Sequence, residues 1–403
     1  MNSSKRKSIL FVSARLPYPT VEGHQIRTFG VLQELAKQYD IYLLSILRPG
    51  EIIDHENSLG KICKEIHGVP ITSNIFAYAY AFTHAITKRL PFVVSKYVTP
   101  SLITKYKELV SYINPDLAHF DLLPLGQLAR YTPSSVPFVL NEHNVESSLI
   151  EQKLATLTSP LQTLIFNREL KYLRIFESSI TELADLTLAC SHADKIELET
   201  MRANKVQVIP NGIDTNFLQK NNNALKAGYN LVFLGGMGWY PNRFGLIWFI
   251  ENVFPLLISK LPDIHLNVIG NPEPSINIPN EVKEHINILG FVDDFRSTVS
   301  ESSIMIVPLN LGSGTRLKVL EGMAMGKCIV STSKGSEGIE VTHGEHLLLA
   351  NTAEEFCSAI IDCFKSPDLL KKLGSNAQVR AVEMYDWNVI GKDLIKSYDD
   401  VMR

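Results

Sequence analysis

The stretch from Ser303 to Ile339 reads SIMIVPLNLGSGTRLKVLEGMAMGKCIVSTSKGSEGI and decides the fold of the second half of the chain. An apolar run at 304–307, closed by a proline, predicts a buried parallel strand. Small residues follow at 312–315, and the apolar repeat that begins at Arg316 predicts a helix. A second apolar run at 328–332 predicts the next strand. The stretch is therefore typical of a strand–turn–helix–strand unit in an α/β sheet.

The glycine turn at the start of this predicted helix has the character of an anion site. Free backbone N–H groups and the positive end of the helix dipole together suit a diphosphate. Arg316 and Lys318 oppose that dipole at a cost of about 0.3–1 kcal/mol each, which an anionic ligand would offset. Glu321 can accept hydrogen bonds from sugar or ribose hydroxyls. An ordinary strand–loop–helix unit with a solvated charged face is the alternative.

Length and composition indicate a globular protein with two domains. The chain has 403 residues, with 45% hydrophobic and 20% charged residues, as is ordinary for soluble proteins. No apolar run reaches the ~18 residues of a membrane span, and the apolar run near the N-terminus is too short for a signal peptide. The five cysteines show no C-x-x-C spacing. We therefore expect buried free thiols and a cytoplasmic location.

Charge is uneven along the chain, although the formal net charge is only −3. Residues 1–115 hold 14 Lys and Arg against 8 Asp and Glu. Such a basic part suits an anionic membrane surface or a phosphate-bearing acceptor, and equally a solvated surface without a partner. Aromatic and basic residues interleave at 75–113, which predicts a helical hairpin with its apolar side in the core. Contact with a membrane interface and stacking on single-stranded nucleic acid are the alternatives.

Polar residues follow a predicted strand at 138–140 in the first half of the chain. The strand runs directly into Asn141–Glu142–His143–Asn144, and polar residues at the carboxyl end of a strand mark the ligand crevice of an open α/β sheet. His143 could donate to a sugar hydroxyl or take a proton near neutral pH. A structural histidine in a turn is the alternative. The first strand, at 8–13, is not followed by G-x-G-x-x-G, which argues against a nicotinamide-binding unit.

The motif at 312–326, GSGTRLKVLEGMAMG, resembles the nucleotide-sugar site of GT-B-fold glycosyltransferases of family 4, in the branch with G-x-G-T-R-L-K-x-L-E-x-M-A-x-G. The resemblance covers most of the chain and implies an α/β GT-B fold, with two doubly wound Rossmann-like domains facing a central cleft. It implies an acceptor-binding domain over 1–205 and a nucleotide-sugar-binding domain over 206–385. A terminal helix over 386–403 is expected to cross back to the first domain.

The same resemblance implies roles for individual residues. Two family glutamates, eight positions apart, contact the donor; Glu321 matches the second, which holds the ribose, whereas the first falls on Ser313. Arg316 and Lys318 are expected to carry the diphosphate charge. The expected catalytic residues are His143, Arg316, Lys318 and Glu321. The expected donor-binding residues are Gly235, Gly236, Asn242, Phe291, Val292, Ser313, Gly314, Thr315 and Leu317. The expected acceptor-binding residues are Gly23, His24 and Arg27.

The function that this resemblance implies is retaining glycosyl transfer, from a UDP- or GDP-linked sugar to a glycan or lipid-linked acceptor. Bacterial surface polysaccharide (capsule, exopolysaccharide or lipopolysaccharide) is the expected product. No D-x-D triplet occurs, so we expect no metal, and no separate cofactor is implied. Peripheral contact with the anionic inner face of the plasma membrane is expected, and nucleic acid is not. A nucleotide-sugar epimerase and a non-catalytic sugar-nucleotide binding protein are the alternatives.

Overall fold

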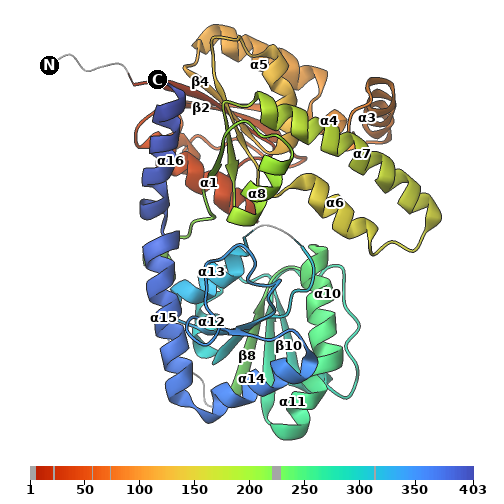
Figure 1. The fold of residues 1–403 in the computed structure, drawn as a ribbon, viewed down its shortest axis with the longest axis vertical. Coiled ribbons are helices and arrows are strands. Elements are labelled where there is room, and N and C mark those ends of the chain that lie inside the picture. Colours follow the sequence, from red (N-terminus) through yellow and green to blue (C-terminus); the bar gives the residue numbers. More distant parts are fainter. Residues whose placement is uncertain (1–5, 21–22, 57, 73, 220–227, 313–314) are drawn as a thin grey trace, which may run out of the picture. The chain divides into compact units, whose positions relative to one another are not determined.

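The computed structural model describes residues 6–20, 23–56, 58–72, 74–219, 228–312 and 315–403 (Figure 1). The chain forms two compact units, each with its own parallel sheet. The first unit is Met1–Asn211 together with Ile390–Arg403, and the second is Gly212–Val389. Among the described helices, none combines the length and the apolar character that crossing a membrane requires.

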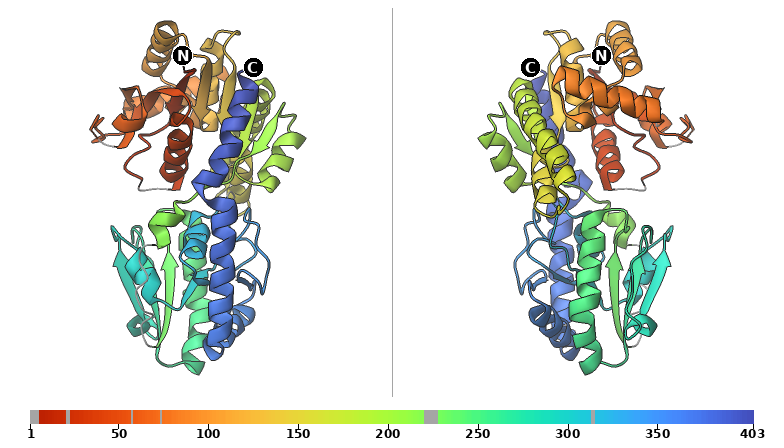
Figure 2. Two further views of the ribbon diagram at one scale, coloured as in Figure 1. Left: turned by 90° about the vertical axis from the view of Figure 1, so that its left-hand side faces the viewer. Right: turned by 90° about the vertical axis from the view of Figure 1, so that its right-hand side faces the viewer.

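The sheet of the first unit has seven parallel strands in the order β3-β2-β1-β4-β5-β6-β7, and helices cover both of its faces (Figure 2). The strands are β1 (Ser8–Ser13), β2 (Asp40–Leu47), β3 (Glu65–Pro70), β4 (Leu117–Asp121), β5 (Phe138–Asn141), β6 (Leu186–Ala189) and β7 (Val206–Val208). The helices are α1 (Gly23–Ala36), α2 (Ser58–Ile62), α3 (Ile75–Lys88), α4 (Phe92–Tyr97), α5 (Pro100–Ile113), η1 (Leu123–Tyr131), α6 (Glu146–Leu154), α7 (Pro160–Leu183), α8 (His192–Thr200) and most of α16 (Trp387–Val401).

The sheet of the second unit has six parallel strands in the order β10-β9-β8-β11-β12-β13. The strands are β8 (Tyr229–Leu234), β9 (Ile264–Ile269), β10 (Ile286–Gly290), β11 (Ile304–Val307), β12 (Cys328–Ser331) and β13 (Leu348–Leu349). The helices are α9 (Thr215–Gln219), α10 (Tyr240–Trp248), η2 (Phe249–Val253), α11 (Phe254–Lys260), η3 (Lys283–His285), α12 (Arg296–Glu301), α13 (Leu317–Ala324), α14 (Ala353–Lys365) and α15 (Pro367–Tyr385).

Both sheets have the strand order of a doubly wound fold, which fixes where ligands bind. In such a sheet the order reverses once, and the crevice beyond the carboxyl ends of the strands at that point is the usual ligand site. The reversal lies between β1 and β4 in the first unit and between β8 and β11 in the second. The buried runs 304–307 and 328–331 form neighbouring strands, which confirms the unit predicted from that stretch.

The boundary between the units differs from the expected one. The division expected at 205/206 precedes β7, but β7 pairs with β6 and completes the first sheet. The contacts change from one unit to the other between Asn211 and Gly212, and again between Val389 and Ile390 within α16. β7 has only three residues, so its apolar pattern is too short to show which sheet it joins.

The segment at 75–113 forms three helices rather than a hairpin. Helix α5 buries Leu102, Tyr106 and Leu109 against the first sheet, so the expected core-facing side is confirmed there. Helix α3 buries only Ala81 and Ala85, so for α3 the expectation is wrong.

Candidate functional site

The predicted donor-binding residues of the second unit lie around its strand-order reversal. Gly235 directly follows β8, and the chain from β11 leads through Thr315 and Arg316 into helix α13. Because parallel strands end at one edge of their sheet, these segments meet beyond the carboxyl ends of β8 and β11. Ser313 and Gly314 lie outside the described residues.

Gly235 is at a position that only glycine fits. Its φ is +154°, and a Cβ there would lie 2.5 Å from Lys318 Nζ and 2.6 Å from Asn242 Nδ2. The missing side chain therefore lets the lysine ammonium approach the backbone after β8. Gly236 is different, because its nearest neighbour would lie 3.6 Å from an added Cβ. Because Gly236 has no side chain, a space is left beside its backbone, and no described residue packs tightly into it.

Lys318 is held in place by groups from two other segments. Its Nζ donates to Asn242 Oδ1 at 2.7 Å, Asn242 Nδ2 donates to the Gly236 carbonyl at 3.0 Å, and Nζ lies 4.5 Å from the Phe233 ring centroid. Burial, and then the charge of Arg316, lower the pKa of Lys318 to about 7. This ammonium is therefore only partly protonated near neutral pH, and a bound anion would favour its protonated form.

Arg316 and Glu321 complete the polar groups around Lys318. Arg316 is the N-cap of α13 and is buried, so the helix begins one residue later than expected, and Thr315 does not cap it. A Cβ on Gly312 would lie 3.0 Å from the Arg316 Nη2, so the guanidinium lies close to the glycine turn. Burial raises the pKa of Glu321 to about 7, against the opposing charge of Lys318. Residues three apart lie on one helix face, so Lys318 and Glu321 are neighbours.

The other predicted donor residues are less closely tied to Lys318. Phe291 is 63% exposed just after β10, whereas Val292 and Leu317 are partly buried and pack against the same hydrophobic cluster. Across the described segments, no hydrogen bond or ion pair joins Phe291 or Val292 to Lys318. The described residues also contain no group of three or more His, Cys, Asp or Glu arranged to hold a metal ion.

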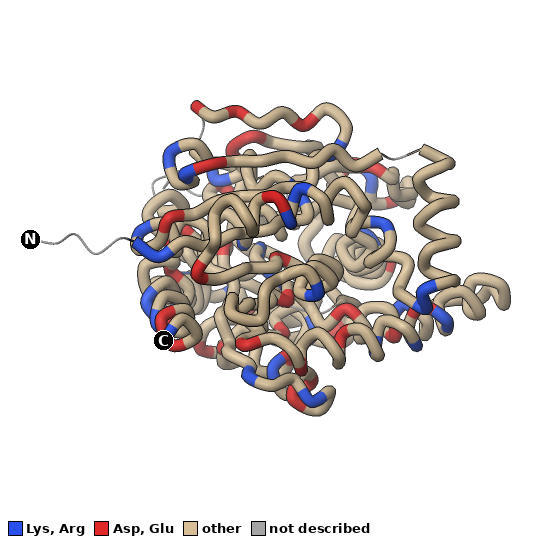
Figure 3. The backbone as a smooth tube through the Cα atoms, turned by 90° about the horizontal axis from the view of Figure 1, so that it is seen from above, with Lys and Arg blue, Asp and Glu red and all other residues tan. Residues whose placement is uncertain are grey.

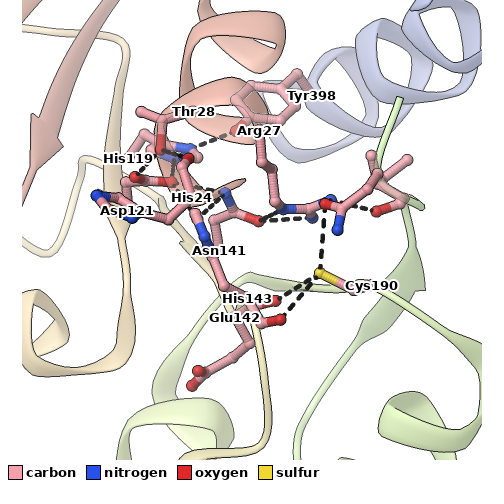
Figure 4. Close-up of polar contacts among 12 residues, drawn as sticks. His24, Arg27, Thr28, His119, Asp121, Asn141, Glu142, His143, Cys190 and Tyr398 are labelled. Atoms are coloured by element: carbon pink, nitrogen blue, oxygen red, sulfur yellow. Dashed lines mark hydrogen bonds and ion pairs between the residues drawn. The ribbon is translucent and has the colours of Figure 1, made fainter. Parts of the chain in front are cut away.

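A buried polar network occupies the corresponding edge of the first sheet (Figure 4). Asp121, at the end of β4, accepts hydrogen bonds from Thr28 Oγ1 at 2.6 Å, Asn141 Nδ2 at 2.7 Å and His143 Nε2 at 2.9 Å. Burial alone would raise the pKa of Asp121, but the neighbouring imidazoles of His143 and His119 hold it well below its ordinary range. Asp121 therefore stays ionised and fixes the orientation of His143, the predicted catalytic histidine.

Arg27 is the central cation of this network. It donates to Asn141 Oδ1 at 2.8 Å, to the Ile209 carbonyl at 2.8 Å and to Asn211 Oδ1 at 3.1 Å. Its side chain is only 1% exposed, so this geometry gives Arg27 a role in holding the strand ends together rather than in direct acceptor contact. Of the other predicted acceptor residues, Gly23 is exposed and His24 is partly buried, both in the first turn of α1.

Several members of this network were not predicted. His119 lies in the middle of β4, stacks on Phe11 at 3.9 Å between ring centroids, and its Nδ1 lies 2.5 Å from the Tyr398 hydroxyl. The C-terminal helix α16 is thereby joined to the first sheet. Asp121 was also missed, although it lies at the carboxyl end of β4, as His143 lies just beyond the carboxyl end of β5.

Glu142 is a second buried carboxyl group beside His143, and in Figure 4 its side chain points away from the network. It is 1% exposed, and neither carboxyl oxygen has a hydrogen-bond partner within the described segments. Burial, and then the charges of Glu177, Glu146 and Asp194, raise its pKa well above the ordinary value. Burial therefore favours the neutral, protonated form of Glu142 over the carboxylate.

A Glu142→Gln variant is expected to gain stability relative to the wild type as pH rises, because only the wild type must give up or keep a buried proton at this position. The folded chain binds this proton more tightly than the unfolded chain, so Glu142 makes stability fall as pH rises from about 4.5 through the raised pKa. Urea unfolding at pH 6, 7 and 8 measures the difference. Glu177→Gln is the control. Glu177 accepts hydrogen bonds from the backbone N–H groups of Ser147 and Glu146, so this variant should be less stable than the wild type. Equal pH dependence in wild type and Glu142→Gln would contradict this assignment.

The fold and this glycine-lined, basic site define an α/β protein of the GT-B type. Residues 21–217 match the family described as Glycosyltransferase Family 4, and residues 228–366 match the family described as Glycosyl transferases group 1. The chain therefore belongs to the family 4 glycosyltransferases, as the motif at 312–326 predicted.

Curated relatives and solved structures agree with this placement. An uncharacterized 44.6 kDa protein in the cps region of Klebsiella pneumoniae is 32% identical over 177 residues, which are 41% of this chain and 45% of the relative. A phosphatidyl-myo-inositol mannosyltransferase of Mycobacterium tuberculosis is 23% identical over 52% of this chain and 57% of its own length. The chain thus spans about half the length of these relatives. The crystal structure of Anabaena HepE in complex with UDP has a TM-score of 0.68 at 14% identity, covering 98% of this chain and 100% of HepE.

Proposed function

We propose that this protein is a retaining glycosyltransferase that moves a sugar from a UDP- or GDP-linked donor to a glycan or lipid-linked acceptor in the synthesis of a bacterial surface polysaccharide. The observation that carries the proposal is the close approach of Lys318 Nζ, Asn242 and Gly235 at the strand-order reversal of the second sheet. A cation held against a glycine backbone near the start of a helix suits a nucleotide diphosphate.

The relatives support the finer parts of this proposal. The mannosyltransferase of M. tuberculosis is named for a phosphatidylinositol acceptor, and the K. pneumoniae relative lies in a cps region. HepE is described in complex with UDP. A lipid-linked acceptor and a place on the inner face of the plasma membrane are part of the same proposal.

In the proposed mechanism the protein stabilises the departing nucleotide diphosphate electrostatically. Arg316, Lys318 and the first N–H groups of α13 would neutralise its charge, and such preorganised groups commonly contribute about 2–4 kcal/mol each. Glu321 would accept hydrogen bonds from the ribose hydroxyls. His143, oriented by Asp121, would contact the reacting sugar. No separate cofactor is part of this scheme, and the acceptor hydroxyl would attack the same face that the nucleotide leaves.

Thermal shift with UDP, GDP and dTDP, each alone and as a sugar conjugate, tests the donor half of this proposal. Saturation at 100 times Kd stabilises a protein by about 2.7 kcal/mol, so the matching nucleotide should raise Tm by several degrees. Nucleotide release that requires an acceptor then identifies transfer. A new sugar nucleotide formed from donor alone would instead indicate an epimerase. Tight binding without turnover on any acceptor would indicate a binding protein.

The pH dependence of nucleotide binding gives a more specific test of Lys318. Its pKa of about 7 means that at pH 8 the free site is largely deprotonated, and a diphosphate would draw a proton onto it. Calorimetry in buffers of different ionisation enthalpy should therefore show uptake of up to about one proton per UDP at pH 8. Affinity should fall by up to about tenfold per pH unit above pH 7. Lys318→Gln should abolish this uptake, and unchanged uptake would exclude Lys318 as its source.

A further inference from the structure

Helix α3 exposes an apolar surface to solvent. Ile75 is 78% exposed, Phe76 80%, Phe82 54% and Ile86 49%. Positions 75, 79, 82 and 86 lie in one row along the helix and Phe76 lies beside that row, while the small residues Ala81 and Ala85 are buried. The usual orientation of an amphipathic helix is thus reversed, because its large apolar side chains point away from the core. A contiguous exposed apolar patch marks an interaction surface.

The first turns of α7 also expose large apolar side chains. Leu161, Leu164 and Ile165 are all more than half exposed. The two helices are joined through Arg168 of α7, whose Nη2 donates to the carbonyl of Ala85 in α3 at 2.8 Å. Both helices lie on the face turned toward the viewer in the right-hand view of Figure 2. We name this surface the apolar face. It consists of Ile75, Phe76, Ala79, Phe82 and Ile86 of α3 and Leu161, Leu164 and Ile165 of α7.

Helix α3 packs on α4 with its inner side, but its large apolar side chains lie on the outer side and are exposed. A cavity of about 190 Å³ lies beside the helix and is lined in part by Tyr78, Ala81 and Lys96. Contacts to α4 hold α3 along its length, since the Tyr78 ring stacks on Phe92 and His84 Nδ1 lies 3.1 Å from Ser95 Oγ. The exposed row on the other side of the helix is left uncovered by the described residues of this chain.

The charged residues on helix α3 and in the sequence beside it are all basic. Residues 66–107 contain no Asp or Glu and five Lys or Arg, and in Figure 3 helix α3, at the right-hand edge, is uncoloured up to the basic residues at its end. Lys88 and Arg89 are exposed there. On α7, Glu169 accepts the N–H groups of Phe92 and Val93 and lies 3.7 Å from Arg168, and Glu151 of α6 is paired with Arg174 at 2.6 Å.

We propose that the apolar face is a membrane-docking surface that inserts into the interfacial layer of an anionic phospholipid monolayer. Phe76 and Phe82 would enter the acyl boundary, Tyr78 and Tyr80 would lie at the level of the head groups, and the basic residues at the end of α3 would contact lipid phosphates. The absence of acidic groups at 66–107 favours an anionic lipid surface over a protein partner with a mixed surface. Docking would bring the first unit to a lipid-linked acceptor, a consequence that rests on the proposed function.

Co-sedimentation of the full chain with vesicles tests this proposal. The wild type should bind phosphatidylglycerol–phosphatidylethanolamine vesicles at low salt, bind more weakly at high salt, and bind phosphatidylcholine vesicles poorly. A Phe76→Ser/Phe82→Ser variant should bind at least tenfold more weakly. Ile52→Ser/Ile196→Ser is the matched control, since both side chains are in the same unit, more than 60% exposed and outside the apolar face; it should bind as the wild type does.

A fluorescent label locates the contact. The five native cysteines are all buried, so an exposed Ala79→Cys can carry an environment-sensitive dye, whose emission should rise on anionic vesicles. Wild type that stays in the supernatant at low salt, or a label that does not respond, would overturn the proposal. So would a wild-type dimer that becomes a monomer in the Phe76→Ser/Phe82→Ser variant without vesicle binding, since a second copy would then cover the face. The Kd for UDP is measured on each protein to keep this test separate from the proposed function. If the Phe76→Ser/Phe82→Ser variant keeps both the wild-type Kd and the wild-type vesicle binding, only the docking surface is rejected.

Discussion

A Lys318→Met variant is expected to lose activity by about 10²–10³-fold while keeping or gaining stability. Activity falls because Lys318 Nζ, held by Asn242 and the Phe233 ring, would no longer neutralise the departing diphosphate. Stability is kept because burial already disfavours this ammonium and lowers its pKa to about 7. Initial rates at saturating donor, with Tm measured on the same samples, separate the two effects. Arg316→Gln should lose activity by a similar factor.

Lys327 provides a matched control for this variant. It is also buried, and burial lowers its pKa to about 8, but its Nζ donates to the carbonyls of Ser300 at 2.7 Å and Ser302 at 2.9 Å. Lys327→Met should therefore lower Tm, because two buried acceptors lose their donor, and leave the Kd for UDP unchanged. If Lys318→Met and Arg316→Gln both kept more than a tenth of wild-type activity, their assignment to the diphosphate would be wrong.

The second large effect is expected from Gly235→Ala, which should weaken UDP binding by at least about 10²-fold and destabilise the second unit by about 2–4 kcal/mol. The added methyl group would lie 2.5 Å from Lys318 Nζ and 2.6 Å from Asn242 Nδ2. The backbone there, at φ +154°, is also one that other residues rarely adopt. Isothermal calorimetry and urea unfolding measure the two losses.

Two nearby glycines distinguish steric strain from blocked ligand access. A Cβ on Gly236 or on Gly238 would lie 3.6 Å from the nearest atom of the surrounding described residues. Gly238→Ala should therefore resemble the wild type in stability. Gly236→Ala should fold normally and yet bind UDP more weakly, because the proposed donor approaches this backbone. Wild-type affinity in Gly235→Ala would reject the site itself.

The stretch at 303–339 was sufficient to predict a strand, a glycine turn and a helix with basic residues at its start. It could not predict the partner of Lys318, because Asn242 lies 76 residues away in the sequence. That contact depends on β8 pairing with β11, which strand order determines. Helical spacing also misplaced the helix start by one residue, since the Arg316 backbone is extended.

Sequence reasoning was weaker in the first unit, where long-range contacts decide the roles of the side chains. Arg27 was expected to touch the acceptor, but its partners Asn141 and Asn211 lie 114 and 184 residues away, so no local pattern could show that it is buried. Helix α3 was expected to face the core because its residues are apolar. Composition does not show which side of a helix faces the protein, and only the tertiary packing does.

The pairing of His119 with Tyr398 has a consequence for how the protein is made. The first unit needs Ile390–Arg403 in addition to Met1–Asn211, so the ribosome completes Gly212–Val389 before it supplies the helix that covers β4. The second unit is continuous in the chain and can fold as soon as it emerges, whereas in the nascent first unit His119 must wait for its partner Tyr398. Domains generally fold in the order of synthesis; here the unit that is translated first is the last to be finished.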